Sequence, residues 1–196
     1  MSCVSRRCLL KNRWTAAAGE RTIFFPALSS GMADGLGEGR VQGHPVQSWQ
    51  GRDMVLFIHL DGVLHPTHCD PSQHFVHLPR LEAVLRQHVA LQMALAAGEE
   101  DLCLIDELLG KFSGDVAKRV IGDTSGSGGK SDEQTRYDQI RRFLRRQGLP
   151  RDNWAALDDA KDEFPPSCRQ VVLCRPEVGF DEDAECRLRT RLLGRV

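Results

Sequence analysis

Hydrophobic positions along the chain follow two different periods from Met54 onward. Met54–Leu60 is a nearly continuous apolar run, which is the pattern of a parallel strand buried on both faces. Leu78–His88 has apolar residues at spacings of three and four, which predicts a helix with Pro79 in its first turn. Further strands are expected at Ala90–Ala97, within Val116–Ile121 after a short helical turn, at Trp154–Leu157 and at Gln170–Cys174.

Three more segments predict helices. Asp132–Gln147 shows the clearest helical period, and Gly148 and Pro150 end it. The last helix is expected to begin after Asp181, because this residue type caps helix N-termini and basic residues follow near the helix end. The predicted apolar stripes are Leu104, Leu108 and Phe112 in Leu102–Phe112, and Tyr137, Ile140 and Leu144 in Asp132–Gln147.

The alternation of strands and helices predicts the fold class. It indicates an α/β protein with a Rossmann-like parallel sheet and helices on both faces. The connecting segments 65–78 and 122–133 are short, so no large cap domain is expected. GDTSGSGG, residues 122–129, has the composition of a flexible loop.

The first 53 residues differ from the rest of the chain. They are rich in Gly, Ser and Ala and have no sustained hydrophobic period, which predicts a disordered or non-native extension before a domain at 54–196. The basic, acid-free residues 1–19 also faintly resemble a transit peptide, but the preferred interpretation is an extension.

Composition excludes some classes of function. The chain of 196 residues is 41% apolar and 27% charged, with a net charge of −1, which gives no support for a dedicated nucleic-acid or membrane protein. It has no apolar run near the roughly 20 residues of a membrane span. The seven scattered cysteines form no CxxC motif, which favours free thiols and a cytoplasmic location. Nothing in the sequence predicts an oligomeric state.

Carboxylates follow two of the predicted strands. His59, Asp61 and Gly62 come at the end of the first, and Asp158 and Asp159 at the end of a later one. Because the carboxyl ends of parallel strands share one edge, these side chains are expected to converge. Carboxylate oxygens suit Mg²⁺, and a glycine such as Gly62 lets backbone N–H groups approach a phosphate. Arg136, or else Lys130, is the candidate cation for neutralising phosphate charge.

Four segments in this order carry a family resemblance. FIHLDGVLHP, FVHLPRLEAVL, RYDQIRRFL and WAALDDAKDEFP resemble the haloacid dehalogenase (HAD) superfamily, and more narrowly the small HAD domains of bacteria and of modular RNA-repair proteins. The likeness covers about residues 54–195. It implies phosphoryl transfer with Mg²⁺ through an aspartyl-phosphate, with a phosphorylated molecule as substrate.

The resemblance also implies roles for individual residues. Asp61 matches the general acid/base, Asp158 and Asp159 match the metal carboxylates, and Arg136 matches the basic residue, with Lys130 second. His59, however, stands where the nucleophilic aspartate belongs. A further departure is the run Ala96, Ala97 and Gly98, which replaces a strand end rich in Ser and Thr.

These departures change the predicted function. Imidazole is a poor ligand for Mg²⁺, so losing the aspartate weakens the metal site and removes the covalent route. We therefore expect a HAD-like phosphohydrolase fold that is impaired or inactive as a phosphatase, with His59 at the catalytic position. The alternative is a non-catalytic module that binds phosphate, metal or RNA.

Two other clusters suggest different chemistry. Six side chains that suit zinc or copper fall within 19 residues, although most are expected on a loop surface, where histidines need no special role. Four arginines flank the apolar face of the predicted helix Asp132–Gln147. A solvated face is the simpler interpretation of these arginines, and an RNA-binding surface is the alternative. The clusters are His59, His65, His68, Cys69, His74 and His77, and Arg141, Arg142, Arg145 and Arg146.

Overall fold

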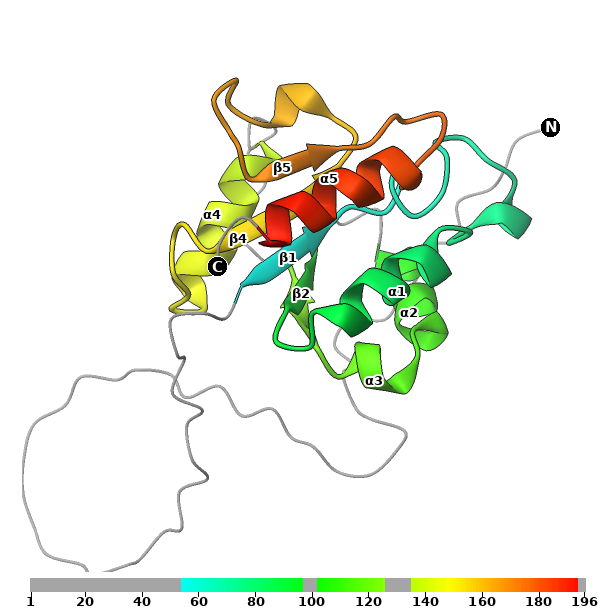
Figure 1. Ribbon diagram of the computed structural model, residues 1–196, viewed down its shortest axis with the longest axis horizontal. Coiled ribbons are helices and arrows are strands. Elements are labelled where there is room, and N and C mark those ends of the chain that lie inside the picture. The colour runs from blue at the N-terminus through cyan, green and yellow to red at the C-terminus, as the bar shows by residue number, and fades with distance from the viewer. Residues whose placement is uncertain (1–53, 97–101, 126–134, 194–196) are drawn as a thin grey trace, which may run out of the picture. The chain divides into compact units, whose positions relative to one another are not determined.

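A five-stranded parallel sheet in the order β3-β2-β1-β4-β5 forms the centre of the fold (Figure 1). The computed structural model describes residues 54–96, 102–125 and 135–193. The strands are β1 (Val55–Ile58), β2 (Gln92–Leu95), β3 (Val120–Asp123), β4 (Trp154–Asp158) and β5 (Val171–Leu173).

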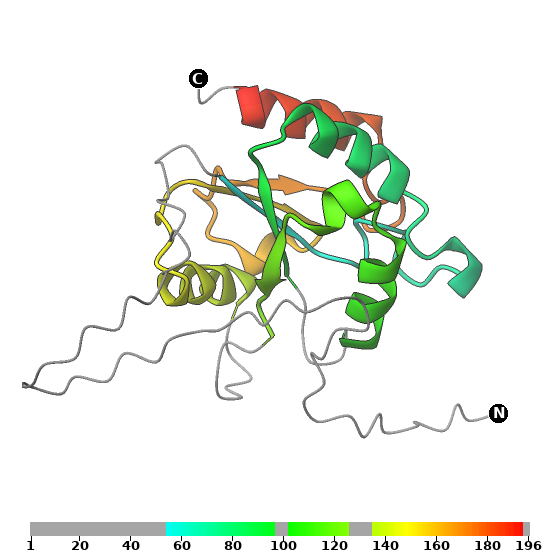
Figure 2. The ribbon, with the colours of Figure 1, turned by 90° about the horizontal axis from the view of Figure 1, so that it is seen from below.

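Helices cover both faces of this sheet. In Figure 2, α4 lies on one side of the sheet, and α1 and α5 lie on the other. The predicted Rossmann-like α/β fold is therefore confirmed, and the described residues include no large cap between the strands. The helices are α1 (Leu78–Gln87), α2 (Leu102–Lys111), α3 (Gly114–Ala117), α4 (Arg136–Arg146) and α5 (Glu182–Leu193), with short 3₁₀-helices at Pro71–Gln73 and Lys161–Glu163.

Two apolar clusters hold the layers together, one on each face of the sheet. Alternate β1 residues divide between them: Leu56 and Ile58 face α1 and α5, and Val55 and Phe57 face α4. On the α4 side the ring of Phe57 packs edge-on against Phe143 at a centroid distance of 5.5 Å. β1 is buried along its whole length, as its continuous apolar run predicts.

β1 lies at the point where the chain reverses the order in which it adds strands. Its two neighbours are β2 on one side and β4 on the other, with Ile58 level with both Leu95 and Leu157. In open α/β sheets, side chains just beyond the carboxyl ends of such strands face a shared crevice. The residues after Ile58 and Leu157 are therefore the ones placed for a site.

The start of α4 differs from the sequence prediction. The helix begins at Arg136, not at Asp132, because Thr135 has extended backbone angles and its hydroxyl accepts the N–H of Asp138 at 3.3 Å. Residues 132–134 lie outside the described part of the chain. A Thr followed three residues later by an acid is an N-terminal capping arrangement, and it locates the first residue of the helix more accurately than the apolar period does.

The remaining elements agree closely with expectation, with three differences. β3 runs on to Asp123, so the predicted loop at 122–129 begins later, and its residues from 126 onward are not described. β4 includes Asp158 as its last residue. Phe143 joins Ile140 and Leu144 in the core, while Tyr137 is only partly buried. Leu104 lies outside the residues whose side chains are described.

None of the helices in the described residues is long and apolar enough to cross a membrane. The predicted extension, residues 1–53, lies outside the described part, so the boundary at 54 stays a prediction.

Candidate functional site

His59 extends from the end of β1 between the two neighbouring strands. Its backbone N–H donates to Leu157 O on the β4 side at 3.0 Å, and its Nδ1 lies 2.7 Å from Ala96 O on the β2 side. A carbonyl oxygen only accepts, so Nδ1 carries the proton of this bond. The other ring nitrogen, Nε2, then lies 4.0 Å from Oδ1 of Asp159, with both side chains largely buried.

The turn after His59 brings Asp159 against Gly62. Gly62 has a φ of +64°, and a Cβ at this position would overlap the Asp159 carboxylate. The amides of Val63 and Leu64 both donate to Leu60 O, at 3.3 and 2.8 Å, which closes the turn. The glycine expected to allow a phosphate to approach therefore allows a carboxylate to approach; phosphate binding at Gly62 stays a prediction.

Asp61, the predicted acid/base, binds a histidine four residues later. Its Oδ1 lies 2.8 Å from Nε2 of His65, and its own side chain is about half exposed, at 48%. Burial lowers the pKa of His65, against the opposing effect of the Asp61 carboxylate. The sequence analysis does not pair His65 with Asp61, although the spacing of four in a tight turn is a signal that could have found the pair.

Asp158 and Arg136 form a buried ion pair at the end of β4. Nε of Arg136 lies 3.4 Å from Oδ2 of Asp158, whose side chain is fully buried. Oδ1 accepts the N–H of Ala160 at 2.9 Å. Burial raises the pKa of Asp158, while electrostatic interaction with Arg136 and, to a smaller extent, with His59 lowers it. The prediction that Arg136 is the basic residue near these carboxylates fits this contact.

This ion pair leaves two polar atoms without a hydrogen bond. Within the described residues, Oδ2 of Asp158 and Nη1 of Arg136 are buried and have no hydrogen-bonding partner. Arg136 is otherwise fixed through its backbone, whose N–H donates to Glu163 at 2.6 Å. Buried unpaired groups are costly, so their presence marks this strand end as a place where a ligand could add bonds.

Each of the three predicted site carboxylates faces a nitrogen group. Asp61 faces His65, Asp158 faces Arg136 and Asp159 faces His59. Mg²⁺ requires oxygen ligands in near-octahedral geometry, and an imidazole at the first strand end supplies none. The residues present therefore fit Mg²⁺ poorly: of the two predicted metal carboxylates, Asp159 is only slightly exposed and Asp158 is fully buried beside Arg136.

The other predicted positions do not contribute to these three carboxylate–nitrogen contacts. Lys130, Ala97 and Gly98 lie outside the described residues, so their contributions stay predictions. Of the clustered histidines, His77 binds the Val178 carbonyl through Nε2 at 2.7 Å, and His68 is exposed. The expectation that most of this cluster lies on a loop surface is wrong: of its six residues, all described, only His68 is exposed, and His65 is buried at 1% exposure.

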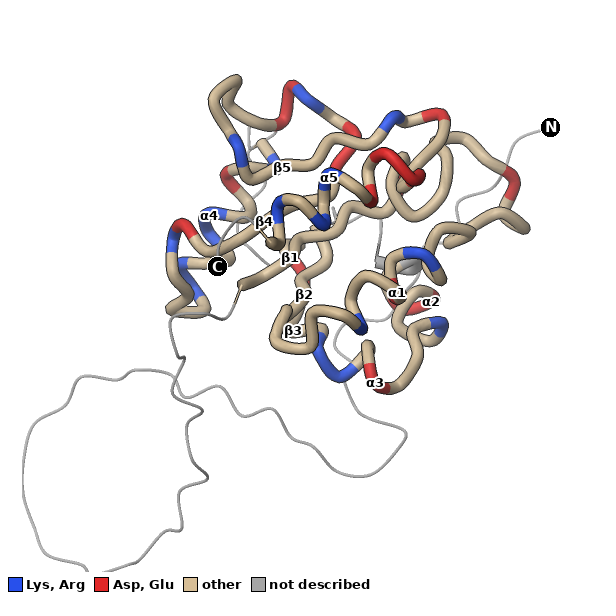
Figure 3. Tube along the Cα trace, viewed as in Figure 1, with Lys and Arg blue, Asp and Glu red and all other residues tan. Residues whose placement is uncertain are grey.

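Basic residues recur along α4 (Figure 3), and contacts within the fold use some of them. Arg141 donates to Arg151 O at 2.6 Å, and the guanidinium of Arg146 lies over the Phe143 ring at 5.7 Å. Arg145 and Arg146 are exposed and the other two half-buried. This pattern fits the simpler interpretation, a largely solvated helix face.

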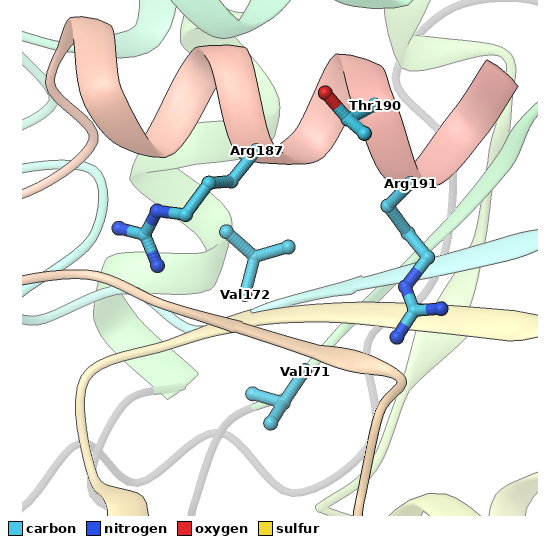
Figure 4. A pocket seen from close by; sticks show the side chains of 5 residues that line it. All are labelled: Val171, Val172, Arg187, Thr190 and Arg191. Carbon is cyan, nitrogen blue, oxygen red and sulfur yellow. The ribbon is translucent and has the colours of Figure 1, made fainter. Parts of the chain in front are cut away.

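A separate groove of about 320 Å³ lies between β5 and α5. In Figure 4, Arg187 and Arg191 extend from α5 toward β5 on either side of Val172. Nη2 of Arg187 pairs with the Asp183 carboxylate at 3.0 Å and donates to the Leu173 carbonyl at 2.9 Å. None of the predicted site residues that the structure describes lines this groove.

Comparison with known proteins identifies one family. A family model described as the HAD domain in Swiss Army Knife RNA repair proteins matches residues 55–184. No curated protein and no solved structure matches the chain. The matched range begins with β1 and ends in α5, so it includes both strand ends described above.

Proposed function

The chain belongs to the family of HAD domains in Swiss Army Knife RNA repair proteins, and we propose that it is a phosphohydrolase-fold domain impaired as a Mg²⁺-dependent phosphatase. The observation that carries the proposal is the setting of His59. This imidazole lies where the family resemblance places the nucleophile. Its Nδ1 is hydrogen-bonded to Ala96 O at 2.7 Å, and its Nε2 lies 4.0 Å from Oδ1 of Asp159.

The setting of His59 opposes the covalent route in two ways. Without a carboxylate at this position, no aspartyl-phosphate can form and one anionic ligand of Mg²⁺ is lost. The proton on Nδ1 leaves Nε2 as the nitrogen that could attack phosphorus, but Nε2 faces the Asp159 carboxylate. A negative charge there repels an approaching phosphate unless a cation separates the two.

Restoring the aspartate tests the proposal. We expect the wild-type protein to show no Mg²⁺-dependent hydrolysis of an aryl phosphate above the background of Asp61→Asn. His59→Asp should raise the rate by at least about tenfold, which corresponds to roughly 1.4 kcal/mol of activation free energy. His59→Asn is the matched control, because it has a similar size to aspartate but supplies neither a nucleophile nor an anionic ligand.

Two further results bear on this test. In the His59→Asp background, Asp61→Asn should abolish the gained activity if Asp61 is the acid/base. Substantial Mg²⁺-dependent turnover by the wild type that Asp61→Asn removes would contradict an impaired enzyme.

A non-catalytic module that binds a phosphate group, such as one on RNA, is the second candidate. The buried Nη1 of Arg136 has no hydrogen-bond partner among the described residues, which favours this candidate because a phosphate oxygen is a strong acceptor for guanidinium. The family description names RNA repair, so terminally phosphorylated RNA is the first probe. Arg136→Met should weaken its binding more than Arg145→Met, which removes an exposed arginine of the same helix, and equal loss would indicate only nonspecific charge.

A further inference from the structure

Three soft metal ligands lie together in the loop that follows β1. The ligand atoms of His65, Cys69 and His74 are all within 4.8 Å of one another. His65 is buried, whereas Cys69 and His74 are partly exposed. We propose that these three side chains bind Zn²⁺ and leave one coordination position open, at a site separate from the Mg²⁺ position implied by the fold.

The hydrogen bonds of His65 determine which of its nitrogens can bind a metal. Nε2 lies 2.8 Å from the Asp61 carboxylate, which only accepts, so Nε2 carries the proton. Nδ1 accepts the backbone N–H of Phe75 at a long 3.5 Å, and it must therefore be unprotonated. Both bonds require the same tautomer, in which Nδ1 is unprotonated. The single lone pair of Nδ1 then binds the metal in place of its long contact with the Phe75 N–H.

Asp61 then acts on the metal through His65. A histidine that binds zinc commonly donates its second N–H to a carboxylate, which orients the ring and makes it a stronger base. The Asp61–His65 pair already has this arrangement. Asp61 is a positioning residue in this role, and committing its carboxylate to His65 is consistent with an impaired acid/base.

The loop backbone is held in an uncommon conformation beside two of the ligands. His68 and Phe75 have φ values of 61° and 62°, and within the described residues they are the non-glycine positions in the left-handed region. Each is next to a ligand, Cys69 and His74 respectively. Bulky residues rarely adopt this conformation, and such outliers concentrate at binding sites.

Backbone hydrogen bonds fix the ends of the loop. Thr67 N–H donates to Pro176 O at 2.8 Å, and His77 N–H donates to Leu64 O at 3.0 Å. Between them Asp70 caps the 3₁₀-helix Pro71–Gln73 by accepting the N–H of Ser72 at 2.9 Å. This turn directs the chain back, so that His74 returns to the side of Cys69.

The ligand types select the metal. One thiolate and two imidazoles suit Zn²⁺, which binds them at about 2.3 and 2.0–2.1 Å in tetrahedral geometry, whereas Mg²⁺ prefers oxygen. These bond lengths place ligand atoms roughly 3.3–3.8 Å apart. The ligand atoms now lie within 4.8 Å of one another, so Zn²⁺ binding requires the partly exposed Cys69 and His74 to move closer to the buried His65.

Aromatic packing is the competing explanation for the cluster. The rings of His65 and His74 are stacked, with centroids 4.7 Å apart and planes at 28°. Packing needs neither the thiol of Cys69 nor the tautomer of His65, and a metal site needs both. Variants of Cys69 and Asp61 therefore separate the two explanations.

The test uses the full chain without a histidine tag, titrated with Co²⁺ and then with Zn²⁺ as competitor. We expect one Co²⁺ per chain, with the absorption band of a thiolate–cobalt bond, and complete displacement by Zn²⁺. Cys69→Ser should remove this band and lower Zn²⁺ affinity at least tenfold. Asp61→Asn should keep the band and lower the affinity about 10–100-fold, the usual effect of losing an outer carboxylate.

Cys168→Ser is the matched control, because Cys168 is also a partly buried free cysteine but lies outside the loop. It should leave the band and the affinity unchanged, and circular dichroism of each apo variant checks that it is folded. Any of three results would overturn the proposal. They are a stoichiometry well below one Co²⁺ per chain, a cobalt spectrum without the thiolate band, and equal Zn²⁺ affinity in Cys69→Ser and the wild type. The result is independent of the His59→Asp phosphatase assay, so either proposal can fail alone.

Discussion

The carboxylate of Asp159 lies directly against the α-carbon of Gly62, at the place where any other residue would put its side chain. This contact joins the turn after β1 to the end of β4, and Asp159 also faces Nε2 of His59 at 4.0 Å. Because glycine has no Cβ, Gly62 allows the ends of β1 and β4 to lie this close together.

Gly62→Ala should destabilise the protein by about 2–4 kcal/mol. The new Cβ overlaps Asp159, and a φ of +64° costs an alanine about 1–2 kcal/mol by itself. Urea unfolding measures the loss. Gly148→Ala is the matched control, because Gly148 has a φ of +65° and nothing within 4 Å of its Cβ position, so it should show the conformational cost alone. Equal losses in the two variants would mean that the Asp159 contact is unimportant.

Because the pKa of Asp158 is raised, the free energy of unfolding is predicted to fall as the pH rises. In the folded protein burial raises this pKa above its ordinary 3.8, so the folded state holds the proton more tightly than the unfolded chain does. The stability that Asp158 contributes is complete at low pH and falls as the pH rises through the folded-state pKa. Relative to Asp158→Asn, the wild type should lose stability with rising pH, by at most about 1.4 kcal/mol per pH unit.

Urea unfolding of both proteins from about pH 4 to about pH 8 checks this sign. Arg136→Met should enlarge the wild-type penalty, because the guanidinium is the largest opposing influence on the pKa of Asp158. A difference between wild type and Asp158→Asn that does not change with pH would contradict the prediction.

How far the sequence could predict this site depended on whether a feature was local. The strand ends were predictable, since apolar runs locate β1 and β4 and place His59 and Asp158 at their ends. The contacts with their partners were only partly predictable: the spacing of four indicates that His65 can reach Asp61, but the ion pair of Arg136 with Asp158 depends on how α4 packs. Arg136 was found as the right type of residue, but its ion pair joins positions 22 apart in sequence and needs α4 to lie on β4.

The errors in α4 have a similar cause. Asp132 and Thr135 are both suitable caps, and the apolar period alone does not choose between them. The hydrogen bond that the Asp138 N–H donates to the Thr135 hydroxyl decides for Thr135. Phe143 was left out of the predicted stripe, yet it is buried against Phe57. Phe143 lies three residues after Ile140, so helical spacing places it on the same face, and Ile140, Phe143 and Leu144 all enter the core.

His65 should make the protein sensitive to acid. Burial lowers its pKa below the ordinary 6.5, so the folded state resists a protonation that the unfolded chain accepts. The stability contributed by neutral His65 is complete above pH 6.5 and falls as the pH drops toward the folded-state pKa. His65→Gln keeps an N–H donor for Asp61 but does not titrate.

The stability difference between wild type and His65→Gln should therefore shrink below pH 6.5, measured by urea unfolding in the presence of a chelator. His88, whose pKa burial also lowers, is present in both proteins and cancels. His68→Asn, at an exposed position in the same loop, is the comparison. A constant difference between wild type and His65→Gln across this range would show that burial does not hold His65 neutral.

Glu82 is a buried carboxylate that connects α1 to the start of α3. It accepts the backbone N–H of Ser113 at 2.6 Å and its hydroxyl at 2.7 Å, and it pairs with Arg86 at 2.9 Å. Glu82→Ala should cost about 3–5 kcal/mol in urea unfolding, because it leaves the Ser113 donors unpaired and opens a small cavity. Glu82→Gln keeps one acceptor oxygen and should cost less.

The Ser113→Ala control separates the two contributions. It removes only the hydroxyl bond and should cost about 1 kcal/mol, since the backbone N–H still reaches Glu82. In the double variant the two losses should not add, because they share this contact. Additive losses would show that Glu82 acts through Arg86 alone, whose side chain is half exposed and whose ion pair is worth little.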